Sequence, residues 1–284
     1  MKNVLLLLDF NNILIKGTAK MPYLSHEGKC TSGIYGMLNQ MVKYINLYSP
    51  DFVFICNDYP PYHRKELFSG YKQKKGEMPK SMLDLFSRVH ESREYCRDVF
   101  NRMNIPVLEE KGFEADDMIA LAIKKYHKEF KKIVIVSNDS DLYQLLVYQN
   151  VLMDKGPKGG IYSHRELKKD FGILPEQWID VLSIAGSHNA VPSIKKGVKE
   201  KTAIKIMKDE KMYSELLQEY KEEIKLRKRL ARLPFENLSI PILEISEHKK
   251  RKGLMRNFTL YLKRKYGIVQ GNENYEKAFK RFLA

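Results

Sequence analysis

Lys132–Gln144 has the sequence KIVIVSNDSDLYQ. Its run of apolar, β-branched residues, Ile133–Val136, predicts a buried strand. Asp139 and Asp141 follow after a short polar break. Open α/β sheets form their sites at the carboxyl ends of strands, so this pair of acids is placed to hold a divalent cation. The alternative is that Asp139 caps a helix over residues 140–147 and that Asp141 favours the positive end of that helix.

Two further apolar runs are also followed by an acid. Residues 4–10, VLLLLDF, contain Asp9, and residues 51–58, DFVFICND, end on Asp58. Each acid alone is typical of a turn or a helix cap. If the strands of all three runs lie parallel in one sheet, their acids converge on one edge. The repetition therefore favours a shared metal site.

Acids also gather at the start of a predicted helix, Glu114–Tyr126, with the sequence EADDMIALAIKKY. Glu114, Asp116 and Asp117 occupy its first turn. Acids at a helix N-terminus are stabilising by about 0.3–1 kcal/mol each. Three acids in four residues exceed what capping needs, and they repel one another unless a cation offsets their charge. We therefore predict that at least one of them binds a metal.

The spacing of apolar residues predicts the remaining elements. Helices are expected at 32–49 and 81–103, and strands at 105–108 and 150–154. Residues 17–31 are polar and predict no regular element.

Residues 59–80, YPPYHRKELFSGYKQKKGEMPK, combine basic and aromatic side chains. The basic residues are Arg64, Lys65, Lys72, Lys74, Lys75 and Lys80, and the aromatic residues are Tyr59, Tyr62, Phe68 and Tyr71. This mixture suits single-stranded nucleic acid, because cations meet phosphates and rings stack on bases. The alternative is a solvated loop whose aromatic rings pack onto the domain.

A change in composition after about residue 165 introduces a second kind of element. A helix over 175–186 is followed by the loop SHNAVPSIKKGVKE, residues 187–200, and by a helix from about Lys201. Lysines surround Gly197 in this loop, so its amides and the next helix N-terminus are placed to meet the phosphates of a duplex. The alternative is an ordinary helical hairpin on the surface.

Charge and cysteine content limit the partners and the compartment. The chain has 284 residues, with 50 Lys and Arg against 35 Asp and Glu, for a net charge of +15. This excess favours a polyanionic partner, with nucleic acid ahead of membrane. Three widely spaced cysteines form no zinc-binding pattern and favour a reducing cytosol. No apolar run approaches the length of a membrane span.

Five stretches, taken in order, resemble the 5′ nuclease superfamily. They are LLLDFNN, ICND followed by a basic YK segment, FEADD, SNDSDLYQLL and IAGSHNAVPSIKKGVKEKTA. The superfamily includes flap endonucleases, the 5′-3′ exonuclease domain of bacterial DNA polymerase I, and phage enzymes described as RNase H or 5′ exonuclease. The matching stretches run from about residue 4 to 210. A chain of this length suits a phage or stand-alone bacterial member that acts in the bacterial or infected host cytosol.

The resemblance implies an α/β fold with a PIN-like, Rossmann-like, mostly parallel central sheet and flanking helices. The nuclease core would span residues 1–165, with a helical arch at about 60–95. Within the arch, residues 64–95 would form a gateway for a 5′ single strand. Residues 166–284 would form a basic, helical duplex-binding region with a helix-three-turn-helix at about 174–210.

The resemblance also implies roles for individual residues. The first metal site would be formed by Asp9, Asp58, Glu114, Asp116 and Asp139. Asp117 would lie next to it and Asp141 would lean toward a second site. Lys16 and Lys72 would contact the scissile phosphate, and Tyr71 would stack on the strand end. The residues expected to bind nucleic acid are Arg64, Lys65, Lys74, Lys75, Lys195, Lys196, Gly197, Lys199, Lys201 and Thr202.

One departure from the family pattern concerns the second metal. The pattern G-D-x-x-D-N-I-P-G-V supplies two aspartates, but here Gly186–Ile194 has the sequence GSHNAVPSI. Ser187 (or Gly186) and Asn189 stand at the aspartate positions, and Lys199 replaces a glycine. Because Mg²⁺ prefers carboxylates, we expect Mg²⁺ or Mn²⁺ at one tight and one weak site. The resemblance further allows K⁺ at the helix-three-turn-helix.

The implied function is a divalent-metal-dependent 5′ nuclease, either a 5′-3′ exonuclease or a flap endonuclease, acting in DNA replication or repair. In such an enzyme, a bound cation activates water and offsets charge in the transition state. The expected partner is branched or 5′-ended DNA. An RNA–DNA hybrid and replication proteins are further candidates, and a monomer is expected. Two alternatives are a catalytically weakened DNA-binding protein of the same fold and a PIN-type ribonuclease, against which the basic tail and the helix–loop–helix argue.

Overall fold

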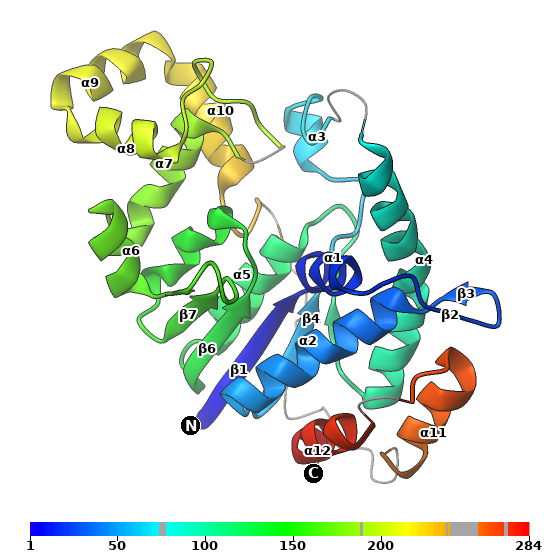
Figure 1. Ribbon diagram of the computed structural model, residues 1–284. Coiled ribbons are helices and arrows are strands. Elements are labelled where there is room, and N and C mark those ends of the chain that lie inside the picture. The colour runs from blue at the N-terminus through cyan, green and yellow to red at the C-terminus, as the bar shows by residue number, and fades with distance from the viewer. Residues whose placement is uncertain (74–77, 188–189, 237, 239–254, 270–271, 284) are drawn as a thin grey trace.

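Six strands form one sheet in the order β5-β4-β1-β6-β7-β8 in the computed structural model (Figure 1). The structure describes all residues except 74–77, 188–189, 237, 239–254, 270–271 and 284. All neighbouring strands are parallel except β7 and β8. The strands are β1 (Lys2–Asp9), β4 (Phe52–Cys56), β5 (Val107–Leu108), β6 (Phe130–Val136), β7 (Val151–Asp154) and β8 (Ile161–Tyr162). The mostly parallel sheet expected from the sequence is confirmed.

Both faces of this sheet are covered, which is why its strands are continuously apolar. Leu5 and Leu7 of β1 join one buried cluster, and Leu6 and Leu8 join another on the opposite face. The cluster on the first face also contains side chains of α5 (Ala115–Tyr126), the 3₁₀ segment η1 (Ser140–Val147), α6 (His164–Phe171), α7 (Trp178–Ala185), which directly follows η2 (Pro175–Gln177), α8 (Glu200–Lys208), α9 (Glu210–Glu219) and α10 (Lys221–Ala231). On the second lie α1 (Phe10–Lys20), α2 (Ser32–Tyr48), α4 (Lys80–Met103), α11 (Met255–Tyr266) and α12 (Asn272–Leu283).

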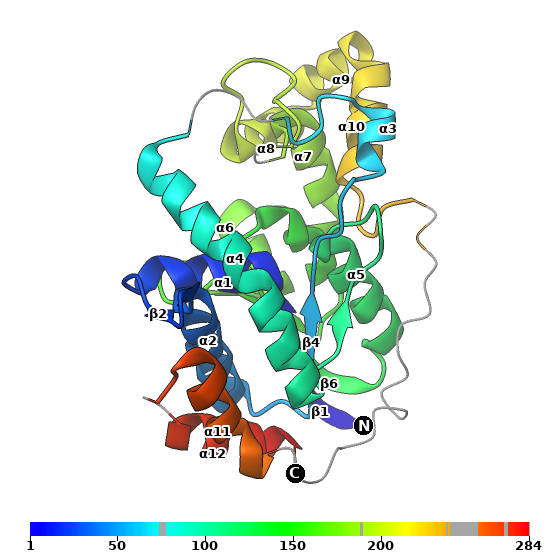
Figure 2. The ribbon, with the colours of Figure 1, turned by 90° about the vertical axis from the view of Figure 1, so that its right-hand side faces the viewer.

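The C-terminal helices revise the expected division at residue 165. Trp178 of α7 and Ala203 of α8 belong to the same buried cluster as β1 and β6. Phe258 of α11 and Phe279 of α12 are instead buried against α2 and α4 on the other face. Figures 1 and 2 show α7–α10 at one end of the molecule and α11 and α12 at the other. The helices described within residues 166–284 therefore pack in two separate places.

The predicted arch is also shorter than expected. It contains α3 (Arg64–Leu67) and the start of α4, with residues 74–77 outside the described part. From Val89 onward α4 buries apolar side chains against the core, including Cys96 and Val99. Residues 89–95 thus belong to the packed core, because their apolar side is needed to cover the sheet.

Local signals were missed in three places. α1 occupies residues expected to be partly irregular, and it begins where Asp9 accepts a hydrogen bond from the Asn12 amide. β8 and α6 were not predicted, and residues 21–31 contain a small hairpin of β2 (Ser25–His26) and β3 (Lys29–Cys30).

Within the described part of the chain, no helix has the length and apolar character needed to cross a bilayer.

Two glycines set the distance between α1 and α2. A Cβ atom built on Gly36 would lie 2.3 Å from the carbonyl carbon of Gly17, and one on Gly17 would lie 2.5 Å from that of Gly36. Both obstacles are backbone atoms, which cannot rotate away. The close approach of these helices therefore requires glycine at both positions.

We predict that Gly36→Ala lowers the free energy of unfolding, because overpacking against backbone atoms costs about 1–3 kcal/mol. The roughly 1 kcal/mol that alanine gains over glycine in a helix should offset this cost only in part. Urea denaturation measures the change. The exposed Leu47 on the same helix provides a control, since Leu47→Ala should change stability by no more than about 0.5 kcal/mol. A Gly36→Ala protein as stable as the parent would contradict the close packing.

Candidate active site

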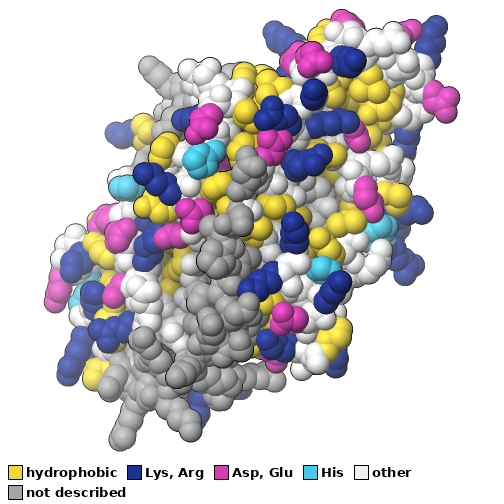
Figure 3. Space-filling view, turned by 180° about the vertical axis from the view of Figure 1, so that it is seen from behind, with side chains coloured by type: hydrophobic (Ala, Val, Ile, Leu, Met, Phe, Trp, Pro, Cys, Tyr) yellow, Lys and Arg dark blue, Asp and Glu magenta, His cyan; other side chains and the backbone are white. Residues whose placement is uncertain are grey.

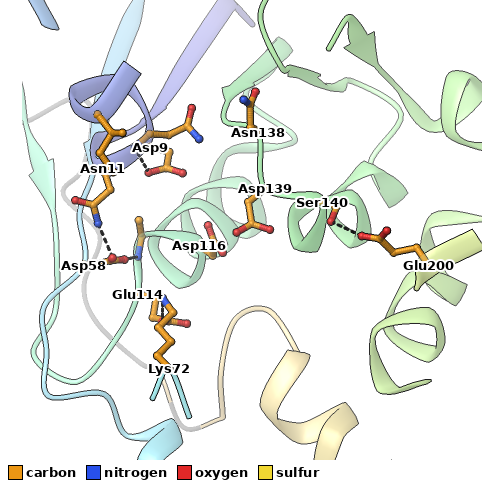
Figure 4. Close-up of a pocket in the computed structure, with 13 residues that line it drawn as sticks. Asp9, Asn11, Asp58, Lys72, Glu114, Asp116, Asn138, Asp139, Ser140 and Glu200 are labelled. Carbon is orange, nitrogen blue, oxygen red and sulfur yellow. Dashed lines mark hydrogen bonds and ion pairs between the residues drawn. The ribbon is translucent and has the colours of Figure 1, made fainter. Parts of the chain in front are cut away.

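An open cavity of about 450 Å³ lies at the carboxyl edge of the sheet. Figure 4 shows the surrounding side chains, which come from strand ends, α5, the arch and α8. The lining residues are Asp9, Asn11, Asn12, Ile15, Asp58, Lys72, Glu114, Ala115, Asp116, Asn138, Asp139, Ser140 and Glu200. Most of the predicted metal-binding acids are among them. Asp117 and Asp141 are not.

Two of the strand-end acids are held by neighbouring elements. Asp9 caps α1 and also accepts a hydrogen bond from the Ser137 hydroxyl at 2.8 Å, just past β6. Asp58 accepts from the Asn11 side chain at 2.5 Å and from the Ala115 amide at 2.7 Å. Asp9 therefore caps a helix, as the alternative predicted, whereas Asp58 joins the start of α1 to the start of α5, and both residues line the cavity.

Repulsion between acids shapes the electrostatics of the cavity. Burial, together with the charge of Asp58, raises the pKa of Asp9 to about 6. Burial raises the pKa of Asp116 well above its usual value, and Asp139 and Asp9 add to the shift. Asp139 caps η1 through the Asp141 amide at 2.9 Å. Bringing these carboxylates together is unfavourable unless positive charge is placed among them.

Glu114 differs from the other cavity acids because it has protein cations as partners. Its carboxylate pairs with the Lys72 ammonium and lies 3.1 Å from the Arg64 guanidinium. Although burial acts to raise the pKa of Glu114, these two cations lower it overall. Lys72 has a positive φ of 50°, and its amide donates to the carbonyl of Ala190 at 3.2 Å. The base of the arch is therefore tied to both Glu114 and the α7–α8 loop.

Asp117 was expected beside the metal site and Arg64 on nucleic acid, and the structure corrects both predictions. Asp117 is fully buried and forms two hydrogen bonds, of 2.6 and 2.9 Å, with Arg64, which is only 2% exposed. Asp117 also forms a capping box with Glu114. The spacing Glu114-x-x-Asp117 is that of a capping box, a sequence signal that was overlooked.

Tyr71 is also placed differently from the expectation. It is 5% exposed, and its hydroxyl donates to Glu114 at 2.7 Å. A ring buried in this way positions Glu114 and is not free to stack on a strand end. Lys16 does not line the cavity but lies within electrostatic reach of Asp9, and burial lowers its pKa to about 8. Asp141 does not line the cavity; its amide donates to Asp139, and burial and the charge of Asp139 raise the pKa of its carboxyl group.

The residues expected to contact nucleic acid are mostly on the surface. Lys65, Lys195, Lys196, Lys199, Lys201 and Thr202 are exposed, whereas Lys74 and Lys75 lie outside the described residues. Gly197 has a φ of 85° and open space where a Cβ atom would be. A duplex backbone can therefore approach this loop closely. Figure 3 shows basic side chains on the back face interspersed with acidic ones, so net charge alone does not identify the binding surface.

Several lining residues were missed by the sequence analysis. Glu200, the first residue of α8, accepts a hydrogen bond from the Ser140 hydroxyl at 3.2 Å and so reaches the acid cluster from the helical region. Asn138 and the Asn11–Asn12 pair flank predicted acids in sequence, which is a usable signal. Glu200 carries no such signal, because only the packing of α8 places it there.

The donor set fits a hard divalent cation. The lining groups are carboxylate and amide oxygens, and the buried side-chain oxygen of Asn12 accepts no hydrogen bond from any described residue. Among the residues described, no group of three or more Asp, Glu, His or Cys side chains is arranged to hold a metal by itself. Mg²⁺ commonly uses one or two carboxylates, several waters and substrate phosphates, so an open, acid-lined cavity is compatible with it.

Known proteins resemble this chain in both sequence and fold. A family model described as 5′-3′ exonuclease, N-terminal resolvase-like domain, matches residues 4–172. The 5′-3′ exonuclease of Aquifex aeolicus is 29% identical over 264 residues, which are 88% of this chain and 88% of that protein. DNA polymerase I of Caldicellulosiruptor bescii is 28% identical over 222 residues, which are 75% of this chain but 25% of the polymerase. A bacteriophage T5 flap endonuclease, solved with DNA and metal ions, shares the fold, with a TM-score of 0.62, 16% identity and 99% of each chain covered.

The neighbours Asp116 and Asp117 should respond oppositely to loss of charge. Asp117→Asn removes the carboxylate that forms two hydrogen bonds with the buried Arg64 guanidinium and leaves only Glu114, which also pairs with Lys72, so we expect a loss of up to about 3–5 kcal/mol in the free energy of unfolding. Asp116→Asn removes a repelled carboxylate, so it should not lower stability in EDTA but should reduce the stabilisation that Mg²⁺ gives. Urea denaturation with EDTA and with Mg²⁺ measures both. Equal losses for the two variants would contradict the structural role of Asp117.

Proposed function

The chain belongs to the 5′-3′ exonuclease family, and we propose that it hydrolyses phosphodiester bonds at 5′ ends or flaps of DNA with the aid of divalent cations. One observation carries the proposal. Asp9, Asp58, Asp116 and Asp139 surround an open cavity, with the Lys72 ammonium at its rim. Such a cavity can take up cations together with a phosphate group, which supplies the remaining ligands.

Different residues would have different roles in the reaction. Asp9, Asp58, Asp116 and Asp139 would hold Mg²⁺ or Mn²⁺. The chemistry that a bound cation supplies is activation of a water molecule and neutralisation of charge on the phosphate. Lys72 would stabilise negative charge on the scissile phosphate. The Glu114 charge raises the pKa of Lys72 against the effect of burial, so the ammonium stays protonated at neutral pH.

The exposed loop between α7 and α8 supports duplex DNA as the partner. Lys196, Lys199 and the open Gly197 would meet backbone phosphates without reading the bases. The segment from α3 to the start of α4 would contact the 5′ single strand. The same proposal includes four further points. They are an RNA–DNA hybrid as a substrate, K⁺ bound at this loop, replication proteins as partners, and action as a monomer. The polymerase activity of the longer relatives does not, since the chain spans about a quarter of them.

We further propose that Glu200 takes part in a second, weaker cation site. Ser187 bears no carboxylate, and Asn189 lies outside the described residues. Glu200 lines the cavity beside Ser140, and its charge contributes to the raised pKa of Asp141. A carboxylate from α8 would thus replace the missing acids of the loop.

The second candidate function is that of a DNA-binding protein without hydrolysis. It is favoured by Ser187, which has no carboxylate at a position where the family pattern has an aspartate.

The primary test is cleavage of a 5′-labelled flap duplex with Mg²⁺, Mn²⁺ or EDTA. We expect short, metal-dependent products, and their lengths distinguish cutting at the junction from removal of terminal nucleotides. Asp139→Ala should reduce the cleavage rate at least about 100-fold. It removes a metal ligand, and the bound metal lowers the activation free energy of hydrolysis by several kcal/mol. It should leave a gel shift of the same duplex nearly unchanged. Binding by the parent protein without product under either metal would favour the DNA-binding alternative.

The Glu200 proposal predicts a change in metal stoichiometry. Mn²⁺ binding, followed by electron paramagnetic resonance, should show one tight and one weak ion in the parent protein, and Glu200→Gln should lose only the weak one. Ser140→Ala provides the control, because it removes the hydrogen bond but keeps the carboxylate, and it should retain both ions. Ser187→Asp in the Glu200→Gln background should restore the weak ion. An unchanged weak site in Glu200→Gln would show that Glu200 is not a ligand.

A further inference from the structure

Leu230–Phe235, the segment at the C-terminal end of α10, contacts two of the elements that carry cavity acids, α5 and η1. Its first contact is with Arg64 of the arch. The Arg64 side chain donates to the carbonyl of Leu230 at 2.8 Å and to that of Arg232 at 3.3 Å. The same guanidinium holds Asp117 of α5, and the Phe235 amide donates to Asp117 at 2.7 Å. The segment is therefore fixed to the helix turn that presents Glu114 and Asp116.

Its second contact is with Gln144 of η1. The Gln144 amide group donates to the carbonyl of Ala231 at 3.0 Å and to that of Asp141 at 2.8 Å, while its oxygen accepts from the Leu233 amide at 3.0 Å. One side chain thus bridges the segment and the turn that presents Asp139 and Asp141. Neither Arg64 nor Gln144 lines the cavity, so both act through other residues.

Two residues in the turn before this segment attach α10 to the region proposed to hold duplex DNA. The Arg227 guanidinium donates to the carbonyl of Pro192 in the α7–α8 loop. Lys228 pairs with Asp180 of α7. Contacts therefore run without a break from the loop, through α10 and the segment 230–235, to the two acid-bearing turns. Such a continuous, packed network is able to carry energetic coupling between sites.

We propose that the segment 230–235 couples duplex binding at the α7–α8 loop to the position of the cavity acids, with Arg64 and Gln144 as positioning residues. The proposal rests on the function proposed above. A shift of the loop moves α10 and, through Arg64 and Gln144, the turns that carry Glu114, Asp116, Asp139 and Asp141. Arginine suits this role because its planar group donates in several directions at once, which lysine cannot do.

The test measures the coupling itself. The Mn²⁺ dissociation constant is determined by electron paramagnetic resonance, with and without a saturating blunt DNA hairpin. In the parent protein the hairpin should tighten Mn²⁺ binding by a factor of about 5–150, the usual range for coupled sites, and Mn²⁺ should tighten hairpin binding equally. In Arg64→Lys and Gln144→Met this factor should fall toward one, although Mn²⁺ still binds.

Arg229→Lys is the matched control. Arg229 lies on the same helix and forms a similar paired contact with Glu236, and among the described residues no hydrogen bond or ion pair joins either side chain to Asp117 or η1. The Arg229→Lys variant should keep the factor by which the hairpin tightens Mn²⁺ binding in the parent protein. Urea unfolding reports any loss of stability, and a merely structural role would lower stability while leaving the factor of the folded protein unchanged.

The outcomes separate this inference from the proposed function. A factor near one in the parent, or the parental factor in both Arg64→Lys and Gln144→Met, overturns the coupling even if the flap duplex is cleaved. A large parental factor that both variants lose supports it, even if no cleavage is seen. Failure of the parent to bind the hairpin overturns the coupling, because there is then no duplex binding to transmit.

Discussion

Repulsion between carboxylates at one edge of the sheet is the constraint on which this structure depends. Parallel strands deliver Asp9, Asp58 and Asp139 to the same edge, and α5 adds Asp116. Burial and mutual repulsion raise the pKa of Asp9 and of Asp116. The folded protein tolerates this arrangement because apolar burial on both faces of the sheet offsets the unfavourable free energy of the buried carboxylates at its edge. The unfavourable charge is what makes the cavity receptive to cations.

Adjacent acids serve opposite purposes in the turn at the start of α5. Asp116 faces the cavity, whereas Asp117 faces inward and neutralises Arg64. Glu114 lies between these roles, since it lines the cavity but is held by Lys72, Tyr71 and Arg64. A buried ion pair is weak evidence for stability in itself. Here the pair has a clearer use, because Arg64 also joins the arch to the end of α10.

The basic residues divide in a similar way between structure and surface. Arg64 and the ring of Tyr71 are buried among the acids, although the sequence around them resembles a solvated nucleic-acid-binding segment. Lys196 and Lys199 are exposed beside the open backbone of Gly197. A strongly positive chain can therefore bind a polyanion through a few well-placed lysines, while other cations stabilise its own carboxylates.

The sequence by itself determined that the chain forms a buried sheet and that acids gather at the carboxyl ends of its strands. Apolar runs such as Ile133–Val136 predict buried strands, and acids directly after them must lie at strand ends, because both signals are local. It could not separate Asp116 from Asp117, nor show that Tyr71 is buried or that Glu200 reaches the cavity. Those outcomes depend on partners distant in the chain, with Arg64 lying 53 residues from Asp117 and Ser140 lying 60 residues from Glu200. Only the tertiary structure decided them, because the direction of a side chain within a turn is set by what packs against that turn.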